Sequence, residues 1–317
     1  MTVIVVGAGI SGVAAARTLA GAGVPVVVLD RGRAIGGRMA SRRPDGRVVD
    51  TGASYFTVSD PAFDEVVQDW RRRGLARPWT DTFSVAGDGE LTPKSGPMRW
   101  AANGGLRSLV EDLATGLELR QVSVESVEPG VEGAGLVVDG EAAEAVVLAM
   151  PDPQARRLLP PELTAELAAL TDPFEPVLAL TARWAEASWP AFDGAFVSGD
   201  PILSWIADDG RRRDDFAPVL VAHSTPEFAA EHLGAPDEAA PLMALAVRDV
   251  LGIAAEPTST AVQRWSFARP AGRREQTYWL GEHRIGFCGD SWSDKPRVEA
   301  AYLSGMALGR AVADQLS

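Results

Sequence analysis

The chain has 317 residues, 46% of them hydrophobic and 23% charged, which is an ordinary balance for a globular protein. This composition disfavours disorder, collagen-like repeats and coiled coils. No run of about 18 apolar residues is present, so no membrane-spanning helix is expected. The net charge of −13 disfavours binding to nucleic acid or to an anionic membrane through bulk charge. A single cysteine, Cys288, and an N-terminus without a secretory signal predict a cytoplasmic protein.

The first 30 residues combine two apolar runs with a glycine-rich turn. Residues 3–6 and 24–29 are rich in β-branched residues and predict buried strands. An alanine-rich stretch between them predicts a helix, and glycines before it permit a tight turn that approaches a pyrophosphate. The free N–H groups of a helix N-terminus favour phosphate. This order predicts a dinucleotide site at Gly7, Gly9, Ser11 and Gly12, with Asp30 accepting hydrogen bonds from a ribose.

Two further glycine-containing segments favour FAD over NAD. The Gly-Gly-Arg loop at 36–38 can close over a pyrophosphate, because its arginine supplies a charge-assisted hydrogen bond. Near the other terminus, an apolar strand ends in Gly-Asp and precedes a helix over 297–315. We expect Asp290 to hold a ribityl hydroxyl or to lie near the pyrophosphate, and the N-terminus of this helix to stabilise negative charge on the reduced flavin. The predicted contacts added here are Gly37, Arg38, Gly289 and Asp290.

These motifs resemble the FAD domain of the glutathione-reductase-like flavoproteins, and more narrowly the amine-oxidase and renalase branch. Residues 50–57 (DTGASYFT) are similar to a D-x-G-A-x-Y-F-T segment of renalase-like proteins. Weaker similarities extend the resemblance over nearly the whole chain, at 147–154, 203–206, 223–228 and 298–305, where Ala300 departs from the usual glycine. The resemblance implies FAD contacts at Arg31, Gly52, Ala53, Val124 and Val298, with the Val124 backbone at the adenine. Because Cys288 lies inside a strand, we expect the FAD to be bound without a covalent link.

The resemblance also implies an α/β fold. A Rossmann-like FAD-binding domain, mostly a parallel sheet with helices, is expected to interlock with an α+β substrate domain built on a mixed or antiparallel sheet. We expect the FAD-binding domain to comprise 1–60, 95–155 and 275–317. The substrate domain is expected to comprise 61–94 and 156–274.

Local patterns predict further helices and strands. Helices are expected over about 61–73, 103–115, 162–170, 226–233 and 237–251. Strands are expected over 117–120, 122–127, 177–182, 201–207, 219–224 and 258–267. Residues 136–138 and 145–148 are expected to form a hairpin around the turn dipeptide Asp139-Gly140.

Aromatic and basic residues in the middle of the chain give candidates for a substrate cavity. A flavin cavity needs flat apolar walls, so we expect Tyr55, Trp205, Trp265 and Trp292 to line it, although tryptophans usually belong to the core. His223 ends a predicted strand and either faces the cavity or has a structural role. Residues 71–73 (RRR) are expected at a solvated helix end, and 211–213 (RRR) in a surface loop or against the phosphates of a dinucleotide. No metal-binding or hydrolase spacing occurs, so no metal is expected.

The reaction is expected to rest on the flavin, while the protein positions the donor carbon. The resemblance to renalases implies oxidation of dihydronicotinamide isomers to NAD(P)⁺, with reoxidation by molecular oxygen to hydrogen peroxide. Such a donor expels hydride with its own nitrogen lone pair, so no catalytic residue is assigned. The predicted partners are a small-molecule substrate or a dinucleotide, and oxygen, without nucleic acid or membrane.

Two alternatives remain open at this point. One is oxidation of a small amine or of a biosynthetic intermediate. Flavin amine oxidases typically place a lysine near flavin N5, whereas Lys94 is expected in a Pro/Gly loop and Lys295 just after the Gly-Asp motif. The other is a scaffold that binds a dinucleotide without turnover.

Overall fold

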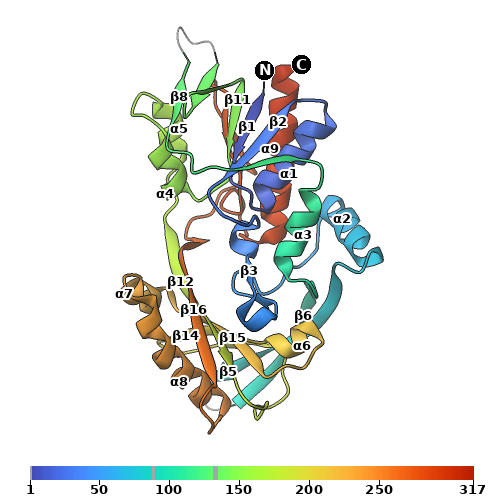
Figure 1. Ribbon diagram of the computed structural model, residues 1–317, viewed down its shortest axis with the longest axis vertical. Helices are drawn as coiled ribbons and strands as arrows, with labels where there is room; N and C mark the ends of the chain where they lie inside the picture. The colour runs from blue at the N-terminus through green and yellow to red at the C-terminus, as the bar shows by residue number, and fades with distance from the viewer. Residues whose placement is uncertain (1, 88–89, 131–134) are drawn as a thin grey trace.

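Two β-sheets lie towards opposite ends of the long axis of the molecule (Figure 1). The computed structural model describes residues 2–87, 90–130 and 135–317. We call the part around the six-stranded sheet the first lobe and the part around the seven-stranded sheet the second lobe. The two chain termini lie together at the far end of the first lobe (Figure 1).

The six-stranded sheet has the strand order β17-β18-β11-β1-β2-β7. All of its pairs are parallel except β17 with β18. Every residue of β1 and β11 is buried, as expected for central strands covered on both faces. The strands are β1 (Val3–Val6), β2 (Val26–Asp30), β7 (Glu118–Gln121), β11 (Ala145–Leu148), β17 (Trp279–Leu280) and β18 (Ile285–Phe287). The predicted Rossmann-like sheet is therefore confirmed.

Helices α1 (Ile10–Gly21) and α9 (Val298–Leu316) cover one face of this sheet (Figure 1). Helix α3 (Leu106–Leu113) packs on α1, and helix α2 (Pro61–Arg72) packs on α9. Helices α1 and α9 pack closely because α9 presents glycine to α1: a Cβ on Gly305 would lie 1.9 Å from the carbonyl oxygen of Ser11. This contact ties the C-terminal helix to the turn that begins α1.

The opposite face carries a small sheet of order β10-β9-β8, formed by β8 (Val127–Pro129), β9 (Leu136–Val138) and β10 (Glu141–Ala143). Asp139 and Gly140 form the turn between β9 and β10, so the predicted turn is confirmed but its second strand is wrong. Residues 145–148 instead pair in parallel with β1. An all-apolar strand buries most hydrophobic surface at the centre of a sheet that is covered on both faces. The strand predicted over 122–127 is also wrong, since β8 begins at Val127.

The seven-stranded sheet has the order β16-β12-β15-β14-β13-β5-β6 and is mixed, because β13 pairs with β5 in parallel and the other pairs are antiparallel. Its strands are β5 (Arg77–Gly87), β6 (Glu90–Ala101), β12 (Phe174–Arg183), β13 (Gly194–Val197), β14 (Leu203–Asp208), β15 (Val219–Ser224) and β16 (Ser259–Pro270). Helices α7 (Pro226–His232) and α8 (Ala239–Leu251) cover one face through an apolar core. The other face points towards the first lobe (Figure 1).

The predicted strands of this lobe were found, but β5, β6 and β13 were not predicted. Pro93 and Pro97 concealed β6, and both are tolerated because β6 is an edge strand. Lys94 therefore lies on a strand, and its expected place in a loop is wrong. It pairs directly with Phe83, so both side chains lie on one face of the sheet.

Short elements connect the two lobes and complete the fold. They are η1 (Gly37–Met39), β3 (Ser41–Arg42), η2 (Pro44–Gly46), β4 (Val49–Asp50), α4 (Asp152–Ala155), η4 (Arg156–Leu158), α5 (Thr164–Ala169), α6 (Asp209–Arg213) and η5 (Pro236–Glu238). The predicted solvated end of α2 is confirmed, because residues 71–73 are exposed. None of the described helices is both long and apolar enough to cross a bilayer.

Candidate active site

Two glycine segments of the first lobe meet at the N-terminus of α1. Gly7 has φ +106°, and a Cβ there would lie 2.6 Å from the carbonyl oxygen of Ala149. The amide of Gly36 donates to the carbonyl of Ala8 at 2.8 Å. A Cβ on Gly37 would lie 3.2 Å from the Cα of Gly9. The predicted phosphate turn and the Gly-Gly-Arg loop thus form one surface built from backbone, which we call the glycine cradle (residues 7–12 and 36–38).

The glycine cradle opens on the unpaired N–H groups of α1. Gly9 caps this helix without a side chain, and no acidic residue stands in the first turn. The residues of α1 itself therefore place no negative charge at the positive end of the helix dipole. These features fit a pyrophosphate, whose oxygens would accept from the free N–H groups.

Asp30 supports the glycine cradle from the end of β2. One carboxylate oxygen accepts from the amide of Ala8 at 2.6 Å and the other from the amide of Gly32 at 2.7 Å. A carboxylate has about four acceptor positions, so two remain for the hydroxyl groups of a ribose. Asp30 therefore orders the turn as well as offering the predicted ribose contact.

Arg38 and Asp290 form a bidentate ion pair, with nitrogen–oxygen distances of 2.6 and 2.9 Å. The sequence predicted separate cofactor contacts for these two residues, and the structure places them side by side. Arg38 also donates to the carbonyl of Ala268 on β16, at 3.2 Å. Next to Asp290, a Cβ on Gly289 would meet no atom within 4 Å, so space is open there. The pair joins the glycine cradle to the Gly-Asp motif and to the second lobe.

The other predicted cofactor residues surround this region. Ser11 is buried beside Cys288, and burial raises the pKa of the Cys288 thiol to about 12, so the thiol stays protonated at neutral pH. A Cβ on Gly52 would lie 2.1 Å from the carbonyl oxygen of Arg38, which places the 50–57 segment against the cradle loop. The remaining residues are exposed (Arg31) or packed on the apolar cores (Ala53, Val124 and Val298).

Side chains of the second lobe hold the 50–57 segment in place. The indole N–H of Trp265 donates to the carbonyl of Thr51 at 2.7 Å, and that of Trp205 donates to the hydroxyl of Ser54 at 3.1 Å. Arg212 donates to the carbonyl of Ser54 at 2.9 Å. Trp205 and Trp265, two of the three tryptophans predicted to line a cavity, therefore hold this segment between the lobes, and their cavity role stays a prediction.

The prediction of a surface loop at 211–213 is wrong for two of its three arginines. Arg212 and Arg213 belong to α6 and are buried, because each forms an ion pair with a buried acidic side chain. Arg213 pairs with Asp50, and Arg212 pairs with Asp209. Burial alone would raise the pKa of Asp209, but the surrounding guanidinium groups outweigh it and hold that pKa below its ordinary value. The Arg213–Asp50 pair crosses from α6 to the 50–57 segment and helps to fix its position, whereas the Arg212–Asp209 pair lies within α6.

An aromatic cluster lies on the second-lobe face near the 50–57 segment. The ring of Tyr55 lies 5.0 Å from Phe83 and 5.8 Å from Trp205, measured between centroids. Trp79 lies 5.4 Å from Phe83. Phe196 lies 4.9 Å from Trp205 and is 46% exposed. We call these five rings the aromatic platform.

The sequence predicts Tyr55 and Trp205 as walls of a flavin cavity, which stays a prediction, and it does not point to the other three rings. The aromatic and β-branched residues over 79–83 (WTDTF) were the available signal for Trp79 and Phe83. Trp292, by contrast, is 2% exposed in a core cluster of the first lobe, where the guanidinium carbon of Arg274 lies 3.9 Å from its ring centroid. Packing explains this position, and a cavity role for Trp292 stays a prediction.

The charges that act on this face are positive. Burial raises the pKa of Tyr55, and Arg99 and Arg269 oppose that shift. Burial, Arg269 and Arg212 together lower the pKa of His223 to about 3, so its imidazole is neutral at physiological pH. A negatively charged ligand would be favoured beside these arginines.

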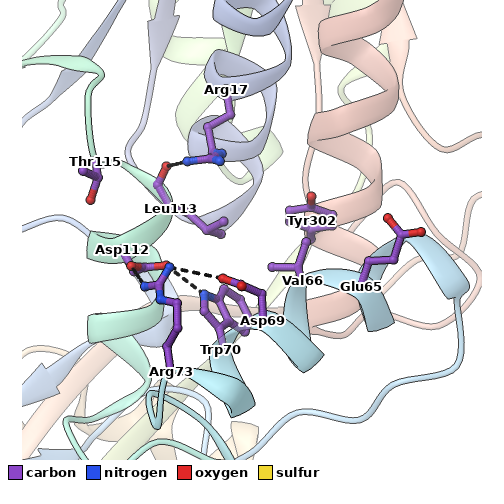
Figure 2. Close-up of a pocket in the computed structure, with 10 residues that line it drawn as sticks. All are labelled: Arg17, Glu65, Val66, Asp69, Trp70, Arg73, Asp112, Leu113, Thr115 and Tyr302. Carbon is purple, nitrogen blue, oxygen red and sulfur yellow. Dashed lines mark hydrogen bonds and ion pairs between the residues drawn. The ribbon is translucent and has the colours of Figure 1, made fainter.

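A hollow of about 500 Å³ lies elsewhere, between α1, α2, α3 and α9 (Figure 2). Most of its polar groups pair with one another: Arg17 donates to the carbonyl of Leu113 at 3.0 Å, and Trp70 donates to Asp112 at 3.1 Å. Arg73 pairs with Asp69 and Asp112 (Figure 2). The residue of α1 that lines this hollow is Arg17, which lies near the middle of the helix and not in its first turn. The hollow is therefore separate from the glycine cradle.

The two-lobed fold and the glycine cradle define a dinucleotide-binding oxidoreductase. Residues 5–70 match the NAD(P)-binding Rossmann-like domain, and residues 72–313 match the flavin containing amine oxidoreductases. Because the second match covers most of the chain, the protein belongs to the flavin containing amine oxidoreductase family. It is an FAD-dependent oxidoreductase, and the cradle described above fits its cofactor.

Similar proteins include enzymes with different substrates. A 4,4'-diapophytoene desaturase (4,4'-diaponeurosporene-forming) of Staphylococcus haemolyticus is 40% identical over 88 residues, which are 27% of this chain and 18% of the desaturase. The chain thus matches less than a fifth of that relative's length. A protoporphyrinogen oxidase candidate from Exiguobacterium sp. 255-15 superposes with a TM-score of 0.77, at 16% identity over 99% of each chain. Cyclohexylamine oxidase from Brevibacterium oxydans IH-35A superposes with a TM-score of 0.74, at 17% identity over 99% of each chain. The structural matches share the fold with this chain.

Proposed function

We propose that the protein oxidises dihydronicotinamide isomers, which carry the hydride at ring position 2 or 6, to NAD(P)⁺. The overall reaction consumes the donor, one proton and molecular oxygen, and it yields NAD(P)⁺ and hydrogen peroxide. Bound FAD would accept the hydride and pass both electrons to oxygen. The residues of the chain would bind the donor, orient its ring and limit access of water.

The charge around Tyr55 and His223 carries this proposal. The charged groups that shift these two side chains are all arginines, namely Arg99, Arg212 and Arg269. Since Arg212 is paired with Asp209, Arg99 and Arg269 are the ones that can act on an incoming anion. A dinucleotide donor brings a pyrophosphate, whose negative charge such a surface attracts. A protonated amine would be repelled by the same charges.

The state of His223 is in accord with a donor that needs no protein base. A side chain whose pKa lies at about 3 is a poor proton acceptor at neutral pH, since efficient bases titrate near the working pH. A dihydronicotinamide releases hydride through its own ring nitrogen, so no proton has to be removed from the reacting carbon.

A second function, oxidation of a small amine, is favoured by one specific observation. Lys94 lies on β6 opposite Phe83, on the face that bears the aromatic platform. A lysine on a strand of the substrate lobe is a usual feature of flavin amine oxidases, so its position supports this function. One structural neighbour is named as a cyclohexylamine oxidase, which also supports oxidation of a small amine.

Anaerobic mixing of the FAD-loaded protein with three donors separates these functions. The donors are a dihydronicotinamide isomer, a primary amine and ordinary NADH, and the measurement is the loss of flavin absorbance near 450 nm. The proposal expects rapid bleaching by the isomer only. Bleaching by the amine alone, abolished in Lys94→Met, would establish the second function instead, and rapid bleaching by ordinary NADH would indicate a reductase.

A further inference from the structure

Four buried polar atoms on or beside the 50–57 segment lack a hydrogen-bond partner in the described part of the chain. They are the hydroxyl oxygen of Thr51, the indole nitrogen of Trp79, the Nε2 atom of His223 and the Nε atom of Arg213, whose guanidinium is already paired with Asp50. An unpaired buried polar group typically costs about 1–3 kcal/mol, so proteins rarely retain one without a reason. The atoms that no charged partner compensates indicate that a ligand completes their hydrogen bonds.

Trp79 indicates most clearly which hydrogen-bonding groups that ligand must carry. An indole nitrogen is a donor only, so its partner must be an acceptor. The guanidinium carbon of Arg212 lies 6.0 Å from the centroid of the Trp79 ring, which places a positive charge nearby. A hydroxyl of Thr51 can donate as well, and a neutral imidazole can donate from one nitrogen.

Arg99 adds a charge at the same surface. Its guanidinium carbon lies 4.2 Å from the centroid of Phe83, and one of its nitrogens donates to the carbonyl of Asp81. The residue is 8% exposed, and within the described ranges it forms no ion pair with a carboxylate. A buried guanidinium is usually paired, so Arg99 is held in place with its charge unmatched.

We propose that Trp79 and Arg99, which both lie against the ring of Phe83, form a subsite for a phosphate group of the substrate, next to the aromatic platform. The inference rests on the proposed function, because the pyrophosphate of the dinucleotide donor is the group assigned to the subsite. Phosphate oxygens accept hydrogen bonds and carry negative charge, which matches one indole donor and one unmatched guanidinium. The half-exposed ring of Phe196 provides a flat apolar surface beside it for a base of the same donor.

The substitution Trp79→Phe tests the subsite without removing a ring. Because the indole N–H has no partner among the residues that the structure describes, its loss should leave the free energy of unfolding unchanged or raise it slightly. We expect the KM for a dihydronicotinamide dinucleotide isomer to rise about tenfold, while kcat changes little. The KM for the matching dihydronicotinamide riboside isomer, which has no phosphate, should stay within about twofold.

Further variants separate a charge effect from a structural one. Arg99→Met should raise the dinucleotide KM and Arg99→Lys should restore part of it. Trp70→Phe is the matched control: it removes an indole N–H that is bonded to Asp112, so it should lower stability and leave both KM values alone.

Calorimetry of inorganic pyrophosphate binding to the FAD-loaded protein gives a readout that does not need turnover. Weaker binding in Trp79→Phe and Arg99→Met than in the wild type supports the subsite. Equal effects of Trp79→Phe on the dinucleotide and the riboside, or unchanged pyrophosphate binding in both variants, would overturn it. If neither isomer bleaches the wild-type flavin, the proposed function fails, and pyrophosphate binding still decides on the subsite.

Discussion

Replacing Gly305 by alanine probes the contact between α9 and the turn that begins α1. The added Cβ would lie 1.9 Å from the carbonyl oxygen of Ser11, whereas ordinary van der Waals contact begins at 3.4 Å. The obstacle is backbone, so the two helices must move apart by more than about 1 Å. Overpacking of this kind costs roughly 1–3 kcal/mol, and the better helix propensity of alanine returns up to about 1 kcal/mol. We expect a net loss of about 1–2 kcal/mol.

The displaced atom belongs to the glycine cradle, so the same substitution should weaken FAD binding. Urea unfolding followed by tryptophan fluorescence gives the stability, and the temperature at which flavin fluorescence appears reports cofactor release. Gly21→Ala is the matched control, because it lies in α1 and its Cβ would meet no atom within 4 Å. Wild-type stability together with a wild-type release temperature in Gly305→Ala would refute this account of the helix contact.

Three further outcomes are expected. Asp30→Ala should lower the FAD content of the purified protein, measured as the ratio of absorbance at about 450 and 280 nm, because the ribose loses an acceptor and the turn loses two hydrogen bonds; full occupancy would contradict the role. Arg212→Met should lower the free energy of unfolding by about 1.5–3 kcal/mol, since it removes one of the guanidinium partners of the buried Asp209 carboxylate while Arg47 still pairs with it, and a loss below about 0.5 kcal/mol in urea titrations would contradict a contribution of this ion pair. His223 binds a proton in the unfolded chain below about pH 6.5 but in the folded chain only near pH 3. The contribution of His223 to the free energy of unfolding therefore falls by about 1.4 kcal/mol for each pH unit as the pH drops from 6.5 towards 3. Unfolding measured from pH 7 to pH 4 should show a shallower decline in His223→Gln, and an unchanged slope would argue against a neutral buried imidazole.

The domain boundaries remain a proposal. The extent of β6 suggests a new position for the boundary expected at 94–95. This strand runs to Ala101 within the seven-stranded sheet, past the boundary expected at 94–95. We therefore propose that the second lobe includes the whole β5–β6 hairpin. Limited proteolysis that leaves 77–101 attached to the second-lobe fragment would support this placement.

The sequence by itself determined the parts of this protein whose information is local. The glycine turn, the acidic end of β2 and the Gly-Asp strand end each need particular residues at fixed spacing, because backbone geometry at a phosphate allows few alternatives. The amphipathic helices and the apolar strands were likewise set by periodicity within a dozen residues.

Only the tertiary structure decided which distant groups meet. Arg212 and Arg213 look like a solvated run in the sequence, yet they are buried because Asp50 and Asp209 lie beside them. Lys94 looks like a loop residue between prolines, yet it stands on an edge strand that tolerates them. Arg99 without a carboxylate and the Trp79 N–H without an acceptor, as found among the described residues, arise only once the sheet has formed, since burial and pairing are properties of three-dimensional packing and not of spacing along the chain.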